Sequence, residues 1–320
     1  MPGTIISIAR RGPGVRYGTA KSWKSSSRFD MKTRSKIWLG VGAFVVVGTG
    51  ATSATGLLAA ETAFGRSARP DRPTDAAISS TDRTVVVQHA GHGPEAGEAG
   101  ETKNFAALPP ELAFAARIAL LRGHLLVGDE LVKQQQWNAA LPHFLHPTEE
   151  IYGDIKGELA EYKVPPFDAE LKALSDVVKA KKGGNDYAKA LKAVNDALAA
   201  ADAGMKAKQA DWPGFVVEAA VEALKAATGE YQQAIIGGRI AKPVEYQDAR
   251  GFVWQAERMI EGVAPDLQKK NAPALSEMRA GLAELKKTFP APMPPRTPVK
   301  DHAAVLGDVS RIELAAGKLM

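Results

Sequence analysis

The feature that most constrains the fold is the residue pattern after Asn104. From Phe105 onward, long segments rich in Ala, Leu, Lys and Glu alternate with short proline and glycine stretches, and apolar residues recur at helical spacing. No alternating pattern of useful length predicts a strand there. The sequence therefore predicts an all-α fold, in which antiparallel amphipathic helices form a single bundle domain over residues 105–320.

Prolines, glycines and short polar residues mark the expected helix ends. Pro110 opens a helix that continues through Val132. Asp168 and Asn185 are expected to cap two later helices. A further amphipathic helix is expected over residues 273–289. These boundaries divide the domain into hairpins of helices.

The first 104 residues have a different composition. Residues 1–36 hold nine Lys or Arg against one acidic residue, a formal charge of +8, and we expect them to be disordered. The uncharged run 37–60 predicts a signal peptide or membrane anchor, and Met31 could be the true start. Residues 61–104 have the composition of a flexible linker. We therefore expect the domain outside the cytoplasm: periplasmic, secreted or tethered to the inner membrane.

Charge and composition narrow the possible functions. The whole chain has a formal charge of +5, which leaves −3 for everything after residue 36, so no basic surface for nucleic acid is expected. The absence of cysteine excludes thiolate metal sites and cysteine nucleophiles. Neither an H-E-x-x-H motif nor a serine nucleophile elbow is present, so the sequence gives no sign of a hydrolase.

Residues 139–154 concentrate imidazoles and carboxylates. If this segment is helical, a step of about 100° per residue places His143, His146, Glu150 and Asp154 on one arc. Nitrogen and oxygen ligands of this kind suit a transition metal ion such as iron, copper or zinc. Alternatively, Pro147 starts a new helix that His146 caps. Glu149 and Glu150 would then lie in its first turn, where the helix dipole stabilises negative charge without a metal ion.

A second candidate metal group lies on the predicted core. His124 faces inward on the first helix, and Glu245 and Asp248 share an apolar helix face. Buried carboxylates need a partner, which could be a cation, a histidine or an arginine such as Arg250. The alternative is that His124 is a hydrogen-bonded structural residue and that the carboxylates lie near solvent in a first helical turn.

Residues 136–155 read QWNAALPHFLHPTEEIYGDI and resemble the imelysin-like family, periplasmic helical proteins associated with bacterial iron uptake. The likeness is a helix hairpin followed by a Glu-x-x-(Tyr/Phe)-Gly-Asp turn, matched by Glu149, Tyr152, Gly153 and Asp154. The family's G-x-H-x-x-E motif is absent, because Val127 stands at the glutamate position after His124. The resemblance implies bundled helical hairpins and a role in handling metal outside the cytoplasm.

Two functions are consistent with these observations. The first is an exported helical-bundle protein that binds a transition metal in iron acquisition, with inner-membrane transport components as partners. The second is a non-catalytic periplasmic scaffold or partner-binding module that holds no metal.

Overall fold

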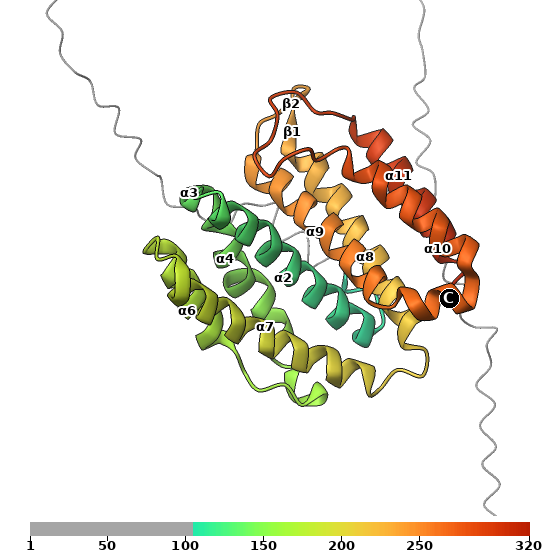
Figure 1. Cartoon of the computed structure of the whole chain (residues 1–320), viewed down its shortest axis with the longest axis horizontal. Coiled ribbons are helices and arrows are strands. Elements are labelled where there is room, and N and C mark those ends of the chain that lie inside the picture. Colours follow the sequence, from blue (N-terminus) through green and yellow to red (C-terminus); the bar gives the residue numbers. More distant parts are fainter. Residues whose placement is uncertain (1–104) are drawn as a thin grey trace, which may run out of the picture. The chain divides into compact units, whose positions relative to one another are not determined.

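The computed structural model describes residues 105–320, and these form an all-α domain (Figure 1). The predictions for residues 1–36, 37–60 and 61–104 concern segments that lie outside the described residues. Within 105–320, no helix combines the length and the apolar character needed to span a bilayer. The all-α prediction is confirmed, and the extended structure in this part of the chain amounts to one short hairpin.

Four helices from the second half of the chain form an antiparallel bundle. They are α8 (Trp212–Ala234), α9 (Pro243–Gly262), α10 (Ala264–Lys286) and α11 (His302–Ala316). The α8–α9 turn is a hairpin of β1 (Ile235–Ile236) and β2 (Arg239–Ile240). Gly237 and Gly238 form its tip with φ of 59° and 72°, the left-handed region that favours glycine.

The first half of the chain packs against this bundle through one long helix. Helix α2 (Pro110–Lys133) contacts both α8 and α9, and Figure 1 shows it between them and α7. The chain then returns through a series of short helices: α3 (Trp137–Ala140), α4 (Pro142–His146), the π-helix η3 (Pro147–Ile151), α5 (Tyr152–Ile155) and the 3₁₀ helix η4 (Leu159–Tyr162). A hairpin of α6 (Asp168–Lys179) and α7 (Gly184–Lys206) completes the domain.

The helix starts at Pro110 and Pro273 are confirmed, but two other expected boundaries were wrong. Phe167, not Asp168, is the N-cap of α6, and Asp168 accepts a hydrogen bond from the Tyr152 hydroxyl. Helix α7 begins one residue before Asn185. The label α10 covers two helices joined by a kink at Asn271, whose backbone is not helical, and the second of them is the helix expected from Pro273. There the Asn271 side chain accepts from the Ala274 N–H and restarts the helix.

Aromatic and aliphatic side chains fill the interior of the domain. Phe289 lies at the centre of one group, with its ring centroid 5.3 Å from those of both Tyr231 and Tyr246. Phe114 stacks on Tyr162 at 4.2 Å and joins α2 to the returning segment. This apolar packing encloses a small number of charged and polar side chains, and they define the candidate site.

Candidate metal centre

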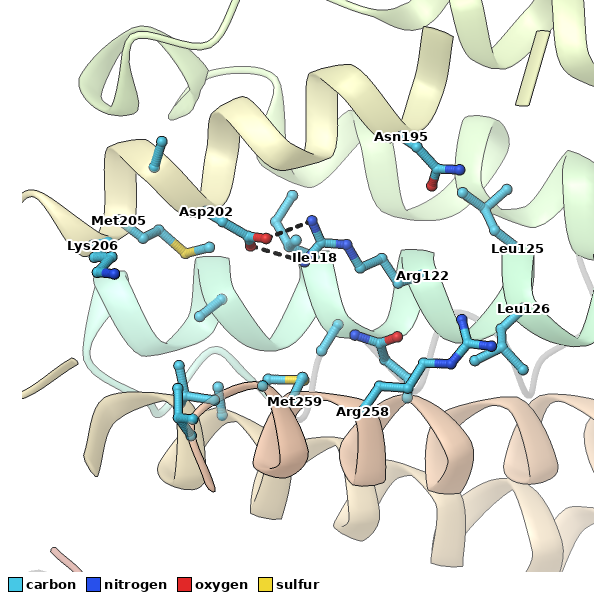
Figure 2. Close-up of a pocket in the computed structure, with 18 of the residues that line it drawn as sticks. Ile118, Arg122, Leu125, Leu126, Asn195, Asp202, Met205, Lys206, Arg258 and Met259 are labelled. Carbon is cyan, nitrogen blue, oxygen red and sulfur yellow. Dashed lines mark hydrogen bonds and ion pairs between the residues drawn. The ribbon is translucent and has the colours of Figure 1, made fainter. Parts of the chain in front are cut away.

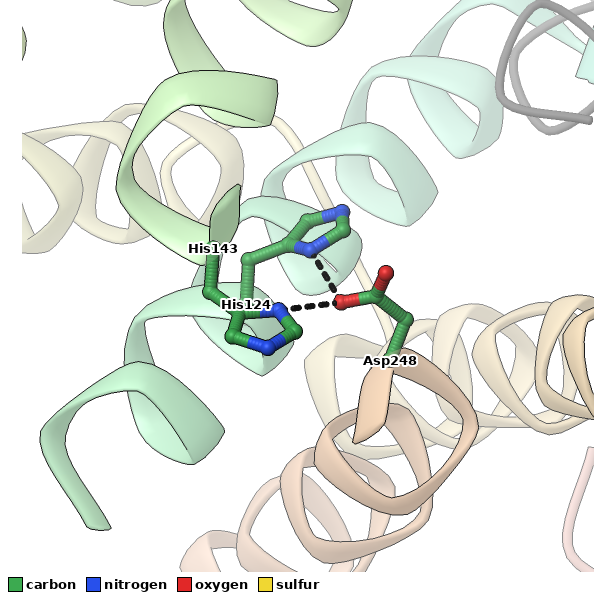
Figure 3. Close-up of side chains that lie close together, drawn as sticks. All are labelled: His124, His143 and Asp248. Carbon is green, nitrogen blue, oxygen red and sulfur yellow. Dashed lines mark hydrogen bonds and ion pairs between the residues drawn. The ribbon is translucent and has the colours of Figure 1, made fainter. Parts of the chain in front are cut away.

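Three helices distant in sequence bring two imidazoles and a carboxylate together. His124 comes from α2, His143 from α4 and Asp248 from α9, and each is at most 1% exposed. Figure 3 shows both rings directed at one carboxylate oxygen. Asp248 Oδ1 lies 2.6 Å from His124 Nδ1 and 2.8 Å from His143 Nδ1. One potential ligand atom from each residue lies within 4.8 Å of the others. We call these three residues the His-Asp cluster.

Glycines allow the helices that carry the cluster to approach closely. A Cβ atom on Gly251 would lie 2.3 Å from the Gly123 carbonyl oxygen, so α2 and α9 touch backbone to backbone beside His124. A Cβ atom on Gly128 would lie 2.7 Å from the Phe144 ring, which fixes how near α4 comes to α2. Any larger side chain at these positions would push the helices apart. The mid-helix glycines thus set the distance between the imidazoles and the carboxylate.

Further side chains surround the cluster. His143 Nε2 lies 2.9 Å from the Gln247 carbonyl oxygen, and the Gln247 amide donates to the Met293 sulfur at 3.6 Å. Both ring nitrogens of His143 therefore face oxygen atoms, an arrangement that orients the ring from two sides. His146 is adjacent, with its Nδ1 3.8 Å from Asp248 Oδ2. The Phe252 ring meets His124 edge-on at 5.0 Å and makes the other side apolar.

Electrostatics keep Asp248 ionised. Complete burial would by itself raise the pKa of this carboxyl group. The charges of His124 and His143 and their hydrogen bonds outweigh burial, so the pKa of Asp248 lies well below its usual range. A buried carboxylate is tolerated here because two imidazoles compensate it. An anionic oxygen between imidazole nitrogens is what a divalent cation requires.

Glu150 and Asp154 are not part of the His-Asp cluster. The segment is helical, but Pro147–Ile151 is a π-helix, in which each residue turns by less than the 100° assumed for an α-helix. A regular helical wheel therefore does not describe the positions after Pro147. Glu150 is half-buried. The Asp154 side chain is 44% exposed and lies 3.8 Å from Arg117.

Glu245 is also outside the cluster. It is buried, at 4% exposure, but its carboxylate accepts a hydrogen bond of 2.7 Å from Lys242 in the first turn of α9. The suggested arginine partner proves to be engaged elsewhere. Arg250 forms a two-pronged ion pair with Glu130 and donates to the Phe289 carbonyl. The histidines, and not an arginine, compensate Asp248.

The His-Asp cluster combines one residue from the first candidate metal group, in residues 139–154, with two residues from the second, interior group. His143 was assigned to the segment 139–154, whereas His124 and Asp248 belonged to the interior group. Gln247 was missed, since an uncharged amide beside a carboxylate gives no particular signal. Gly123 and Gly251 could have been noticed, because a glycine inside a helix usually has a packing reason.

The donor set fits a metal ion. Two imidazoles and one carboxylate, with His146 or water as a further donor, match tetrahedral zinc sites and the two-histidine-one-carboxylate sites of ferrous iron. The observed separations of 2.6 and 2.8 Å are hydrogen-bond distances. Ligands about 2.0–2.1 Å from a tetrahedral ion lie roughly 3.3 Å apart. Loading would therefore replace shared protons and lengthen the two nitrogen–oxygen separations by about 0.5–0.7 Å.

Comparison with known protein families gives a match for the C-terminal part of the chain. Residues 206–320 match the family described as the iron permease-associated 4-helix bundle domain. The matched region corresponds to α8, α9, α10 and α11. No curated protein and no solved structure matches the chain. The match associates this bundle with iron uptake, and it does not extend to the imelysin-like family.

Proposed function

We propose that this protein binds a transition metal ion through the His-Asp cluster and acts in iron acquisition, with ferrous iron as its cargo. One observation carries the proposal: His124, His143 and Asp248 converge in an enclosed space within a domain whose bundle matches an iron permease-associated family. Buried titratable groups that converge in this way are candidates for a functional site.

The cluster connects the matched bundle to the rest of the domain. Asp248 lies within residues 206–320, whereas His124 and His143 lie before them. The bundle alone therefore supplies one of the three donors. The α2 and α4 segments supply the nitrogen ligands, so metal binding would require the whole of residues 105–320. This supports a metal site that belongs to the complete domain.

Ligand chemistry favours ferrous iron among the candidate ions. Thiolates, which favour zinc and cuprous copper, are absent from the chain. Two histidines and one carboxylate are the donor set of non-haem ferrous sites. Copper and zinc would also bind imidazole nitrogen, so selectivity would depend on which ion reaches the protein.

We further propose that the domain works outside the cytoplasm and beside an iron permease in the inner membrane. The basic N-terminal segment and the uncharged run 37–60 support export. The description of the matched family supports the permease as the partner. A protein of this kind would hold ferrous iron until the permease accepts it.

Metal titration of the full chain tests the proposal. Ferrous iron under anaerobic conditions, or cobalt(II) as a coloured substitute, should bind with one ion per chain and micromolar affinity. Asp248→Asn and His124→Ala should each weaken binding at least about tenfold, because each removes one donor. His302→Ala is the matched control, since His302 lies on α11 outside the cluster and should leave affinity unchanged.

A scaffold without metal is the competing function, and one observation favours it. The cluster is already closed by hydrogen bonds of 2.6–2.8 Å, as in a purely structural polar network. Folded wild-type protein that binds none of iron, cobalt, copper or zinc would overturn the metal proposal. Circular dichroism of each variant establishes that lost binding does not reflect unfolding.

A further inference from the structure

A separate cavity of about 580 Å³ lies on the other side of α2, between α2, α7, α8 and α9 (Figure 2). This volume is in the range of small-molecule binding sites. Small side chains create the space, because the helices meet there through alanine and glycine instead of large residues. These small lining residues are Ala115, Ala119, Ala203, Ala219 and Gly262.

About half of the cavity lining is apolar, and this part is adaptable. Met205 from α7 and Met259 from α9 lie across it from one another, and Figure 2 shows both side chains at one end. Trp212 and Phe215 add aromatic surface, with ring centroids 5.9 Å apart. Methionine and aromatic side chains adjust to ligands of varied shape. The body of a ligand here would therefore be apolar.

Gln255 offers a polar group to a ligand in the cavity. This side chain lines the cavity and is only 6% exposed. Within residues 105–320 its amide makes no hydrogen bond or other polar contact. The amide atoms themselves are accessible from the cavity, because they are not among the fully buried polar atoms that lack a partner. A ligand in the cavity could therefore hydrogen-bond Gln255.

The charges around the cavity favour an anion. Arg122 is neutralised by Asp202, with two hydrogen bonds of 2.8 Å visible in Figure 2. Asp129 accepts from Lys133. Among the described residues, no carboxylate pairs with the remaining lining cations, which are Arg258 and Lys206. Both are exposed, so the rim of the cavity is positive.

We propose that this cavity binds an amphipathic organic carboxylate. The carboxylate would pair with Arg258, and Lys206 would add to the positive potential. The apolar body would lie against the methionines and aromatic rings, and Gln255 would hydrogen-bond a polar atom of the ligand. Such a site extends beyond the proposed metal function, because it shares no side chain with the His-Asp cluster.

Calorimetry on the full chain tests this site, with phenylbutyrate as the probe. We expect one site per chain with a Kd below about 1 mM. Phenylbutanol, which has a similar body without the charge, should bind more weakly. Arg258→Gln should weaken phenylbutyrate binding about fivefold, as expected for the loss of a partly exposed charged hydrogen bond. Gln255→Leu should weaken it several-fold.

Two controls separate this site from other effects. Arg239→Gln removes an equally exposed arginine at the β1–β2 hairpin and should leave phenylbutyrate affinity unchanged. His143→Ala should also leave it unchanged, so failure of the metal proposal would not affect this result. Absence of binding at about 1 mM, equal affinity in wild type and Arg258→Gln, or equal affinity for phenylbutanol would each overturn the proposal.

Discussion

The two sides of helix α2 differ in what lies at the helix contacts. On the side of the His-Asp cluster, Gly123 meets Gly251, and a Cβ atom on either would collide with the opposite helix. On the other side, alanines such as Ala115 and Ala219 line a space that the neighbouring helices leave unfilled. The glycines where α2 crosses α9 let the two backbones touch. On the other side, the alanines leave space between the helices, and this space is the cavity.

This difference determines what each side could bind. The cluster is buried, and its three donors are held by helices that cannot move apart without losing backbone contact, which suits a small ion. The cavity is open, with Arg258 and Lys206 at its rim, which suits a larger organic molecule. Substitutions on each side of α2 test whether one side is rigid and structural while the other is not.

The largest effect on stability is expected for Asp248→Ala. This substitution leaves His124 and His143 buried without their shared acceptor, and removing one partner of a buried charge pair costs about 3–5 kcal/mol. Thermal unfolding of metal-free protein should show a melting temperature lower by roughly 10 °C. A loss below about 1 kcal/mol would show that the cluster is not an energetic unit.

The pH dependence of this effect follows from the lowered pKa of Asp248. A carboxyl group with a lowered pKa in the folded state stabilises the protein above its unfolded pKa, about 3.9, and loses that contribution as pH falls. The stability gap between wild type and Asp248→Ala should therefore be largest near neutral pH. It should narrow below about pH 4 in denaturant titrations.

Gly251→Ala should have the next largest effect. The added methyl group would lie 2.3 Å from the Gly123 carbonyl, and relieving such a contact costs about 1–3 kcal/mol despite alanine's higher helix propensity. Chemical denaturation measures this change. Gly229→Ala is the matched control in α8, where no atom lies within 4 Å of the new Cβ, and it should stabilise the protein by about 0.5–1 kcal/mol.

The fold could be predicted from the sequence because it depends on local patterns. Helical apolar spacing and the prolines at helix starts predicted α2 and the all-α class. The interior position of His124 was also predicted correctly, since its helix is apolar on both sides of that residue.

The composition of the candidate site could not be predicted, because it depends on contacts between helices. Nothing near His143 in the sequence indicates that Asp248, 105 residues later, is its acceptor. The regular helical wheel that grouped Glu150 and Asp154 with the histidines does not apply across the π-helix at Pro147–Ile151. The cavity was missed because its lining residues come from four helices.

Metal binding and organic-anion binding should respond differently to pH. Between about pH 7.5 and about pH 5.5, cobalt affinity should fall, because metal ligands bind in their deprotonated form and protons compete with the metal ion. Asp248 contributes nothing to this change, since its lowered pKa keeps it ionised throughout. Phenylbutyrate affinity should stay constant, because arginine and the ligand carboxylate remain charged. Parallel changes for both ligands would contradict two independent sites.

The smallest effect is expected for Arg258→Gln, which removes a charge from the same helix as Asp248. Arg258 is exposed and pairs with no carboxylate among the described residues, so its loss should change the free energy of unfolding by less than about 0.5 kcal/mol. The same variant should nevertheless weaken phenylbutyrate binding. Because α9 carries both charges, a large stability loss for Arg258→Gln would mean that the cavity rim supports the fold, and the contrast between the two sides of α2 would not hold.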